Sequence, residues 1–92
     1  MDFEWDEAKR LKVLAERGVD FIAMTALFDG RPTYTYPSIR GGEERTVTVC
    51  ERNGKMFAVI WMDRSNAVRI ITARRARHGE EREYRKILHG GD

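Results

Sequence analysis

The sequence predicts an α+β domain with two N-terminal helices, a four-stranded and mainly antiparallel sheet, and a C-terminal helix. Three observations support this class: apolar residues recur at helical spacing at both ends of the chain, they alternate through its middle, and short turn signals separate the alternating stretches. Tight turns between consecutive strands favour antiparallel pairing. The length of 92 residues suits a single domain over 1–92, with an ordered core over about 3–88.

Two helices are predicted near the N-terminus, over about 6–17 and 20–29. The first carries apolar residues at helical spacing, begins with acids that complement the helix dipole, and has Gly18 as its C-terminal cap. The second has Asp20 as a capping side chain and ends where "DGRP" breaks the pattern. Its buried stripe consists of Phe21, Met24, Leu27 and Phe28.

Four strands are predicted over 33–37, 45–51, 56–62 and 68–73. Pro37 marks the first as an edge strand, and residues 38–44 are predicted to be a loop. The dipeptide Asn53-Gly54 predicts a hairpin turn. The stretch "MFAVIWM" is apolar throughout, which indicates a central strand covered on both faces.

In the last strand, strict alternation sets Val68, Ile70 and Thr72 against Arg69, Ile71 and Ala73. A final helix over about 78–88 follows, with Tyr84, Ile87 and Leu88 on one stripe.

The composition of the chain indicates where in the cell the protein is located. A single cysteine, Cys50, excludes an internal disulfide and suits a reducing cytoplasm. No apolar run approaches 18 residues, so no transmembrane helix and no membrane partner are expected. The first ten residues, "MDFEWDEAKR", are acidic and amphipathic, unlike a signal peptide. A cytoplasmic location is therefore predicted.

Positive charge is concentrated in one part of the chain. The net charge is only +2, yet residues 64–77 contain five arginines and no acid. Arginine presents a planar fork of donors that matches phosphate oxygens and stacks on bases. This stretch predicts a phosphate-bearing or acidic protein partner. The competing interpretation is a solvated face held by ion pairs.

Several kinds of site lack support. Cys50, His78 and His89 are scattered without an acid–histidine cluster, so neither a metal nor another cofactor is predicted. The stretch "RGGEE" leads into a strand and does not form a glycine-rich phosphate loop before a helix. Ser38 and Ser65 have no evident base nearby for a serine triad.

The candidate catalytic residues are Arg45, Arg69, Arg74, Glu80 and Tyr84, and the candidate RNA-binding residues are Arg17, Arg64, Arg75 and Arg77. The arginines would stabilise charge on a phosphate, Glu80 would act as general base, and Tyr84 would donate a proton or stack on a base. These groups would serve metal-independent RNA cleavage. The alternative has Glu80 paired with Arg77 or Arg82, Tyr84 in the core, and Arg69 paired with an acid on a neighbouring strand.

The chain resembles a known family over roughly residues 3–85. The motifs are W-D-x-x-K at Trp5, G-E-E-R ending at Arg45, and R-I-I-T-A-R from Arg69, followed by E-x-x-x-Y from Glu80. Together they resemble the BrnT-type toxins of bacterial type II toxin–antitoxin systems. The resemblance also marks Lys9 in the first motif and implies that Trp5 lies in the core and that Asp6 caps the first helix.

The resemblance implies a fold related to the RelE and ParE toxins and an endoribonuclease activity that inhibits translation. It also implies a cognate antitoxin that forms a heteromeric complex with the toxin, neutralises it, and binds operator DNA. One departure bears on activity: residues 16–18 read "ERG", with Arg17 where a histidine is common. If that histidine does acid–base work in the family, this chain lacks it, or Arg17 gives only electrostatic help. A non-catalytic module that binds nucleic acid or protein as the antitoxin's partner is the alternative function.

Overall fold

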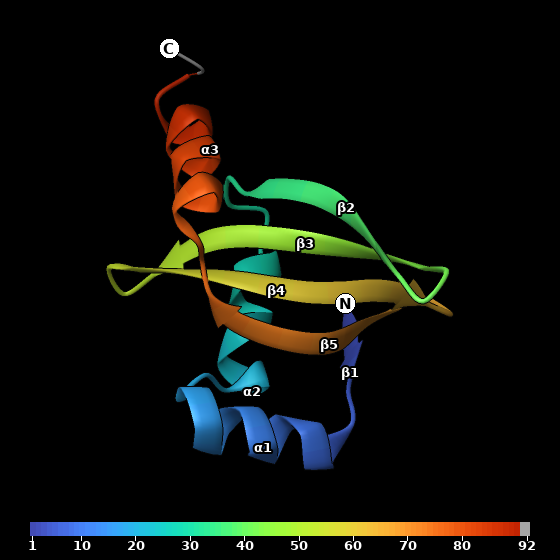
Figure 1. Cartoon of the computed structure of the whole chain (residues 1–92). Coiled ribbons are helices and arrows are strands. Elements are labelled where there is room, and N and C mark those ends of the chain that lie inside the picture. The colour runs from blue at the N-terminus through green and yellow to red at the C-terminus, as the bar shows by residue number, and fades with distance from the viewer. Residues whose placement is uncertain (91–92) are drawn as a thin grey trace.

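The structure is a computed structural model that describes residues 1–90. It is an α+β domain, as predicted, built on a five-stranded mixed sheet in the order β1-β5-β4-β3-β2 (Figure 1). The strands are β1 (Asp2–Glu4), β2 (Tyr34–Arg40), β3 (Glu43–Arg52), β4 (Lys55–Arg64) and β5 (Ala67–Arg75). The helices are α1 (Glu7–Arg17), α2 (Phe21–Met24), the 3₁₀-helix η1 (Thr25–Phe28) and α3 (His78–Leu88). None of the helices within residues 1–90 has the length and apolarity of a membrane span.

The N-terminal strand β1 was not predicted from the sequence, so the sheet has five strands where four were expected. It pairs in parallel with β5 and places Glu4 opposite Arg69. The Phe3 ring in β1 packs edge-on against the Phe28 ring, and the ring centroids are 5.4 Å apart. Three residues are too few to show an alternating pattern, which is why the sequence did not reveal this strand.

The ends of α1 follow the predicted capping chemistry. The Asp6 carboxylate accepts hydrogen bonds from the backbone N–H groups of Ala8 (2.9 Å) and Lys9 (3.3 Å). At the other end Gly18 has φ of +69° and donates its N–H to the Leu14 carbonyl at 2.9 Å. This left-handed conformation is favourable for glycine and terminates the helix.

The second predicted helix is shorter than expected, because the α-helical part ends at Met24 and continues as η1. Asp20 caps it as predicted, accepting from the Ile22 N–H at 3.0 Å. The Thr25 hydroxyl donates to the Ile22 carbonyl at 2.7 Å. This local bond competes with the regular helical pattern and coincides with the change to the tighter 3₁₀ form.

All three hairpins close through two residues with positive φ. Asn53 and Gly54, with φ of 53° and 78°, form the predicted turn between β3 and β4. Gly41 and Gly42, with φ of 58° and 76°, join β2 to β3. The predicted loop over 38–44 is therefore wrong, because both strands extend to this turn. Pro37 does lie on an edge strand, since β2 is the last strand in the order of the sheet and pairs with β3.

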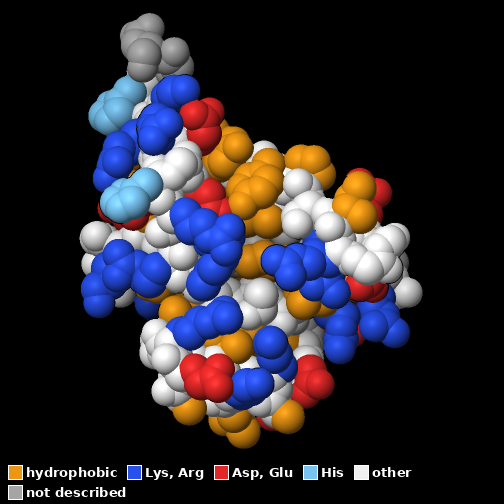
Figure 2. Space-filling view, viewed as in Figure 1, with side chains coloured by type: hydrophobic (Ala, Val, Ile, Leu, Met, Phe, Trp, Pro, Cys, Tyr) orange, Lys and Arg blue, Asp and Glu red, His pale blue; other side chains and the backbone are white. Residues whose placement is uncertain are grey.

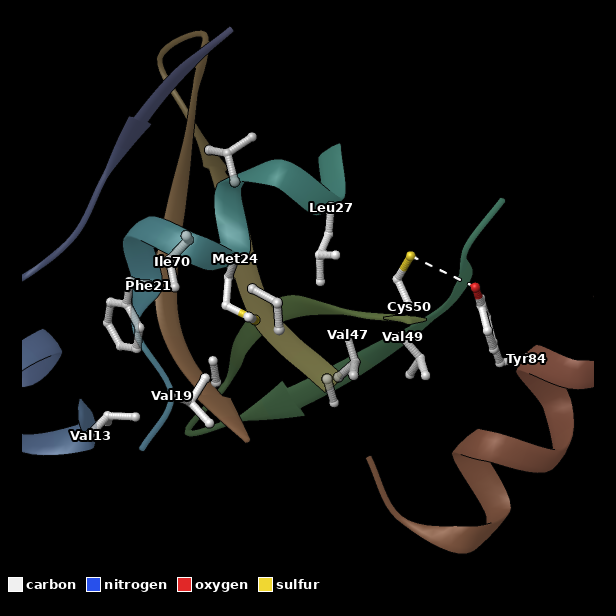
Figure 3. Close-up of a cluster of buried hydrophobic side chains, with 14 residues drawn as sticks. Val13, Val19, Phe21, Met24, Leu27, Val47, Val49, Cys50, Ile70 and Tyr84 are labelled. Atoms are coloured by element: carbon white, nitrogen blue, oxygen red, sulfur yellow. Dashed lines mark hydrogen bonds between the residues drawn. The ribbon is translucent and has the colours of Figure 1, made fainter. Parts of the chain in front are cut away.

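Much of the core fills the space between one face of the sheet and the segment from α1 to η1, and Tyr84 of α3 extends it beside Cys50 (Figure 3). Its largest fully buried side chains include Phe21, Met24, Leu27 and Ile70. The other face is covered at one end by α3, which packs on β2 and β3. Ala58 and Val59, adjacent in β4, are both fully buried, so this central strand is covered on both faces at that point, as predicted.

Candidate functional site

The part of the sheet that α3 leaves uncovered carries a groove of about 360 Å³. Its floor includes a row of residues paired across four strands, Tyr36, Val47, Ile60 and Thr72. Neighbours in such a row point to the same face of the sheet. The parallel row one step nearer to α3 consists of Tyr34, Val49, Ala58 and Arg74.

The groove is strongly basic. Its lining includes six basic residues, Lys9, Arg17, Arg40, Arg45, Arg74 and Arg77. Within residues 1–90 no Asp or Glu side chain lines it. Figure 2 shows Lys and Arg side chains gathered over this view of the molecule, with hydrophobic side chains between them. Several fixed positive charges around one hollow favour an anionic ligand.

A β-bulge directs Arg74 into the groove. Ile60 pairs with Thr72, whereas the next residue of β4, Trp61, pairs with Ile70, so Ile71 is inserted without a partner. Strict alternation from the buried Ile70 would have turned Thr72 and Arg74 toward the core. The predicted alternation through 68–73 is therefore wrong beyond Ile70: Ala73 faces the core and Thr72 faces the groove.

Arg74 and Glu80 form a bidentate ion pair at one wall of the groove. Arg74 Nη1 and Nη2 donate to the two carboxylate oxygens of Glu80 at 2.7 and 2.9 Å. The backbone N–H of Arg77 donates to Glu80 Oε1 at 2.8 Å, and the Tyr36 hydroxyl donates to Oε2. The Glu80 carboxylate is buried and accepts four hydrogen bonds, which occupies its acceptor sites.

These contacts shift the ionisation of the pair. Burial raises the pKa of the Glu80 carboxyl, but hydrogen bonds from Arg74, the Arg77 backbone and Tyr36 outweigh it and lower the pKa from 4.5 to about 2. Burial and the hydrogen bond to Glu80 raise the pKa of the Tyr36 hydroxyl above its ordinary value. Glu80 is therefore ionised and Tyr36 neutral at pH 7, and Arg74 is held in place by a fixed counter-charge.

Two further arginines are oriented by neighbouring groups. Arg17 donates through Nη1 to the Ala73 carbonyl at 2.9 Å and to the Thr72 hydroxyl at 3.2 Å. Arg45 Nη2 donates to Glu43 at 3.0 Å, while its buried Nε has no hydrogen-bond partner within residues 1–90. Each guanidinium has five N–H donors, so both retain donors for a ligand in the groove.

Four of the nine predicted site residues lie elsewhere than in the groove. Arg69 donates to Glu4 at 2.8 Å on the β1 side of the sheet, as the ion-pair alternative foresaw. Arg75 lies over the Phe57 ring at 5.7 Å, and Arg64 is exposed at the end of β4. Tyr84 is 4% exposed and its hydroxyl lies 4.0 Å from Cys50 Sγ (Figure 3). Arg17, Arg45, Arg74 and Arg77 line the groove, and Glu80 reaches it through Arg74 and Tyr36.

The groove residues that were not proposed as site residues from the sequence include Lys9, Tyr36, Ser38 and Arg40. Lys9 belongs to the W-D-x-x-K motif, so a functional reading of that motif could have identified it. Alternation in "TYTYP" could have placed Tyr34 and Tyr36 on one face. The loop assigned to 38–44 concealed the other two, since a loop predicts no side-chain direction. Within residues 1–90 no three His, Cys, Asp or Glu side chains gather as a metal site would require.

Comparison with known proteins assigns the chain to a family. The sequence model of the family described as "Ribonuclease toxin, BrnT, of type II toxin-antitoxin system" matches residues 5–80. A search of curated proteins finds no match. The matched span includes all six basic residues of the groove and Glu80, and ends before Tyr84. Because the match covers most of the chain, this protein belongs to the BrnT ribonuclease toxins of type II toxin–antitoxin systems.

Proposed function

We propose that this protein is a metal-independent endoribonuclease whose groove binds the sugar-phosphate backbone of single-stranded RNA. The observation that carries the proposal is the set of six basic side chains around one hollow, with no carboxylate from residues 1–90 in its lining. In the cytoplasm such cleavage would inhibit translation. A cognate DNA-binding antitoxin would neutralise the toxin in a heteromeric complex and bind operator DNA.

The arginines hold the reacting phosphate. Arg74, positioned by Glu80, and Arg45 of β3 both line the groove and keep N–H donors that can face the phosphate. Arg17 adds positive charge but cannot exchange a proton at neutral pH, so the "ERG" departure leaves electrostatic help at that position. Pre-oriented donors stabilise the charge that gathers on the phosphate oxygens as the reaction proceeds.

In the proposed reaction the RNA 2′-oxygen attacks the adjacent phosphorus. The 2′-hydroxyl loses its proton, the new O–P bond forms, and the bond to the 5′-oxygen breaks as that oxygen gains a proton. The products are a 2′,3′-cyclic phosphate and a 5′-hydroxyl. No external water or cofactor enters this balance.

Glu80 acts as the base through Tyr36. The 2′-hydroxyl donates to the Tyr36 oxygen while the Tyr36 proton passes to Glu80, along the hydrogen bond that already joins them. A carboxyl with a pKa of about 2 is a weak base. When a bound phosphate takes hydrogen bonds from Arg74, Glu80 loses part of the interaction that lowers its pKa, and the effect of burial then raises that pKa. Substrate binding thus strengthens the base.

Lys9 supplies the proton to the leaving oxygen. It lines the groove on α1, and an ammonium can release a proton where a guanidinium cannot. Tyr84, proposed from the sequence as the proton donor, lies on the buried side of α3 beside Cys50 and serves packing. Arg69, paired with Glu4, stabilises the sheet edge.

A non-catalytic docking module is the second candidate. It is favoured by the resting state of Glu80, whose low pKa and four hydrogen bonds describe a structural ion pair. The groove would then receive an acidic segment of the antitoxin. Both functions require positive charge, so sensitivity to salt does not separate them.

The two functions differ in chemistry. Purified protein is incubated with RNA in excess chelator, beside an Arg74→Gln variant and an Arg69→Gln variant as matched control. Fragments with 2′,3′-cyclic phosphate ends from the wild type and from Arg69→Gln, but not from Arg74→Gln, support the ribonuclease. Intact RNA with measurable binding supports the docking module.

A further inference from the structure

A second hollow, of about 350 Å³, adjoins the basic groove. It is lined by Tyr34, Tyr36, Arg77, Gly79 and Glu80, and shares Tyr36 and Arg77 with the groove. The two tyrosine rings project from the same side of the edge strand β2, with centroids 5.4 Å apart and planes tilted by 32°. Both rings are half-buried, so each keeps surface accessible to a ligand.

We propose that this tyrosine shelf stacks an unpaired nucleobase next to the phosphate held in the groove. The proposal rests on the proposed function and adds a base subsite to it. Aromatic side chains beside a positively charged track are the means by which proteins hold single-stranded nucleic acid. Here Tyr36 forms the wall between the two hollows, so a base and its own backbone can occupy them together.

The shelf is rigid and open. The Tyr36 hydroxyl is anchored on Glu80, which fixes the orientation of that ring. Gly79 contributes no side chain, and a Cβ at that position would meet no atom within 4 Å, so the space above it is free. The Arg77 guanidinium can stack on the outer face of a base, as arginine does in complexes with nucleic acid. Figure 2 shows hydrophobic side chains beside α3, next to basic ones.

The carboxylate that lines this hollow is already engaged. Glu80 accepts hydrogen bonds from Arg74, the Arg77 backbone and Tyr36, so it is poorly placed to accept one from an exocyclic amino group. Recognition therefore comes from stacking, which every base can supply. We infer a site that requires a base but discriminates weakly between bases, with purines favoured for their larger rings.

Binding of a short 2′-O-methyl RNA tests the stacking site, because blocking the 2′-hydroxyl prevents cleavage by the proposed mechanism. Affinity is measured for the intact oligonucleotide and for a series in which one position at a time is abasic. For the wild type we expect one abasic position to weaken binding roughly tenfold. Tyr34→Ala should weaken binding of the intact oligonucleotide to a similar degree and bind that abasic version as the wild type does.

Tyr34→Phe keeps the ring and should bind like the wild type, while Tyr34→Leu keeps apolar bulk without the ring and should behave like Tyr34→Ala. The leucine variant also provides the test if the alanine variant fails to fold. The stacking site alone would be overturned by the following result: the wild type cleaves and binds RNA, and in Tyr34→Ala or Tyr34→Leu the ratio of affinities for the intact and the abasic oligonucleotide is the same as in the wild type. Absence of both binding and RNA cleavage in the wild type would overturn the ribonuclease proposal and the subsite with it.

Discussion

Arg69 and Arg74 lie on the same strand, five residues apart, and each forms an ion pair with one glutamate. Arg69 pairs with Glu4 on the neighbouring strand β1, at the edge of the molecule. Arg74 pairs with Glu80 of α3 and lines the groove. The number of carboxylate partners therefore does not distinguish the arginine at the sheet edge from the one in the groove. The surface that the remaining N–H donors face does, and on it rests the proposal that Arg74 acts on RNA.

The bulge at Ile71 accounts for the difference. It reverses the alternation of β5, so that Arg74 reaches the groove and Arg75 lies over Phe57 on the opposite face. Bulges commonly redirect a side chain beside a functional site. The same strand thus has an ion pair at the sheet edge at one end and directs a positively charged side chain into the groove at the other.

The largest expected effect is the loss of RNA cleavage when Arg74, but not Arg69, is replaced. Arg74→Gln should lower the single-turnover rate of RNA cleavage by on the order of 10³, since it removes a pre-oriented, positively charged donor to the phosphate. Arg69→Gln should stay within about threefold of the wild type. Rates are measured at saturating protein with far-UV circular dichroism as a check on folding. Equal losses in the two variants would remove the distinction between the two ends of β5.

The Arg74–Glu80 pair should make stability depend on pH. The folded-state pKa of Glu80, about 2, lies below its ordinary 4.5, so the unfolded chain binds more protons between these values. The contribution of the pair is complete above about pH 4.5 and is lost as pH falls toward 2. From about 1.4 kcal/mol per pKa unit, it is on the order of 3 kcal/mol.

Urea unfolding of the wild type and of Glu80→Gln measures this contribution. We expect the free energies of unfolding to differ most near pH 7 and to converge toward pH 2. Glu7 and Asp29 also have pKa values lowered to about 2, but they titrate in both proteins and cancel in the difference. A difference that does not vary with pH would contradict the ionised state assigned to Glu80.

A smaller effect is expected from the tyrosines. Tyr36→Phe removes the hydroxyl between substrate and Glu80 and should lower the cleavage rate about 10²-fold while changing RNA affinity little. Tyr84→Phe, on the buried side of α3, should leave the cleavage rate within about twofold of the wild type. Single-turnover rates and binding of a 2′-O-methyl RNA separate the two effects. A slow Tyr84→Phe beside a normal Tyr36→Phe would restore Tyr84 as the acid.

The smallest effect concerns the opposite, covered face of the sheet. The Trp61 indole N–H donates to the buried Thr48 hydroxyl at 2.8 Å. Thr48→Val leaves that donor without its partner at similar volume and should lower the free energy of unfolding by about 1–2 kcal/mol. Cleavage per folded molecule should not change, because Thr48 faces away from the groove. A loss of activity in the fully folded variant would show that the two faces are coupled.

Local chemistry made much of this fold predictable. Asp6, Gly18 and Asp20 act through short-range hydrogen bonds and φ preferences, so the sequence indicates their roles directly. The Asn53-Gly54 turn is of the same kind. That Arg45 and Arg74 line the same groove could be predicted only from the chemistry that arginines share and from the family resemblance, because no local pattern connects the two residues.

Tertiary pairing accounts for what the sequence did not reveal. The strand β1 exists because β5 offers it an edge, and its three residues have little pattern of their own. The bulge at Ile71 depends on the register between β4 and β5, and alternation along a single strand contains no information about that register. Lys9 reaches the groove because α1 packs beside β5, a contact between segments far apart in the sequence.

The central claim is that RNA lies on the open face of the sheet, and an NMR titration tests it most directly. A 2′-O-methyl RNA is added to the isotope-labelled protein and backbone amide shifts are followed. We expect the largest changes at groove positions such as Ser38, Val47 and Thr72, and little change along the outer surface of α1 at Leu11 and Leu14. Shifts confined to the α1 surface, with the groove residues unmoved, would contradict the claim.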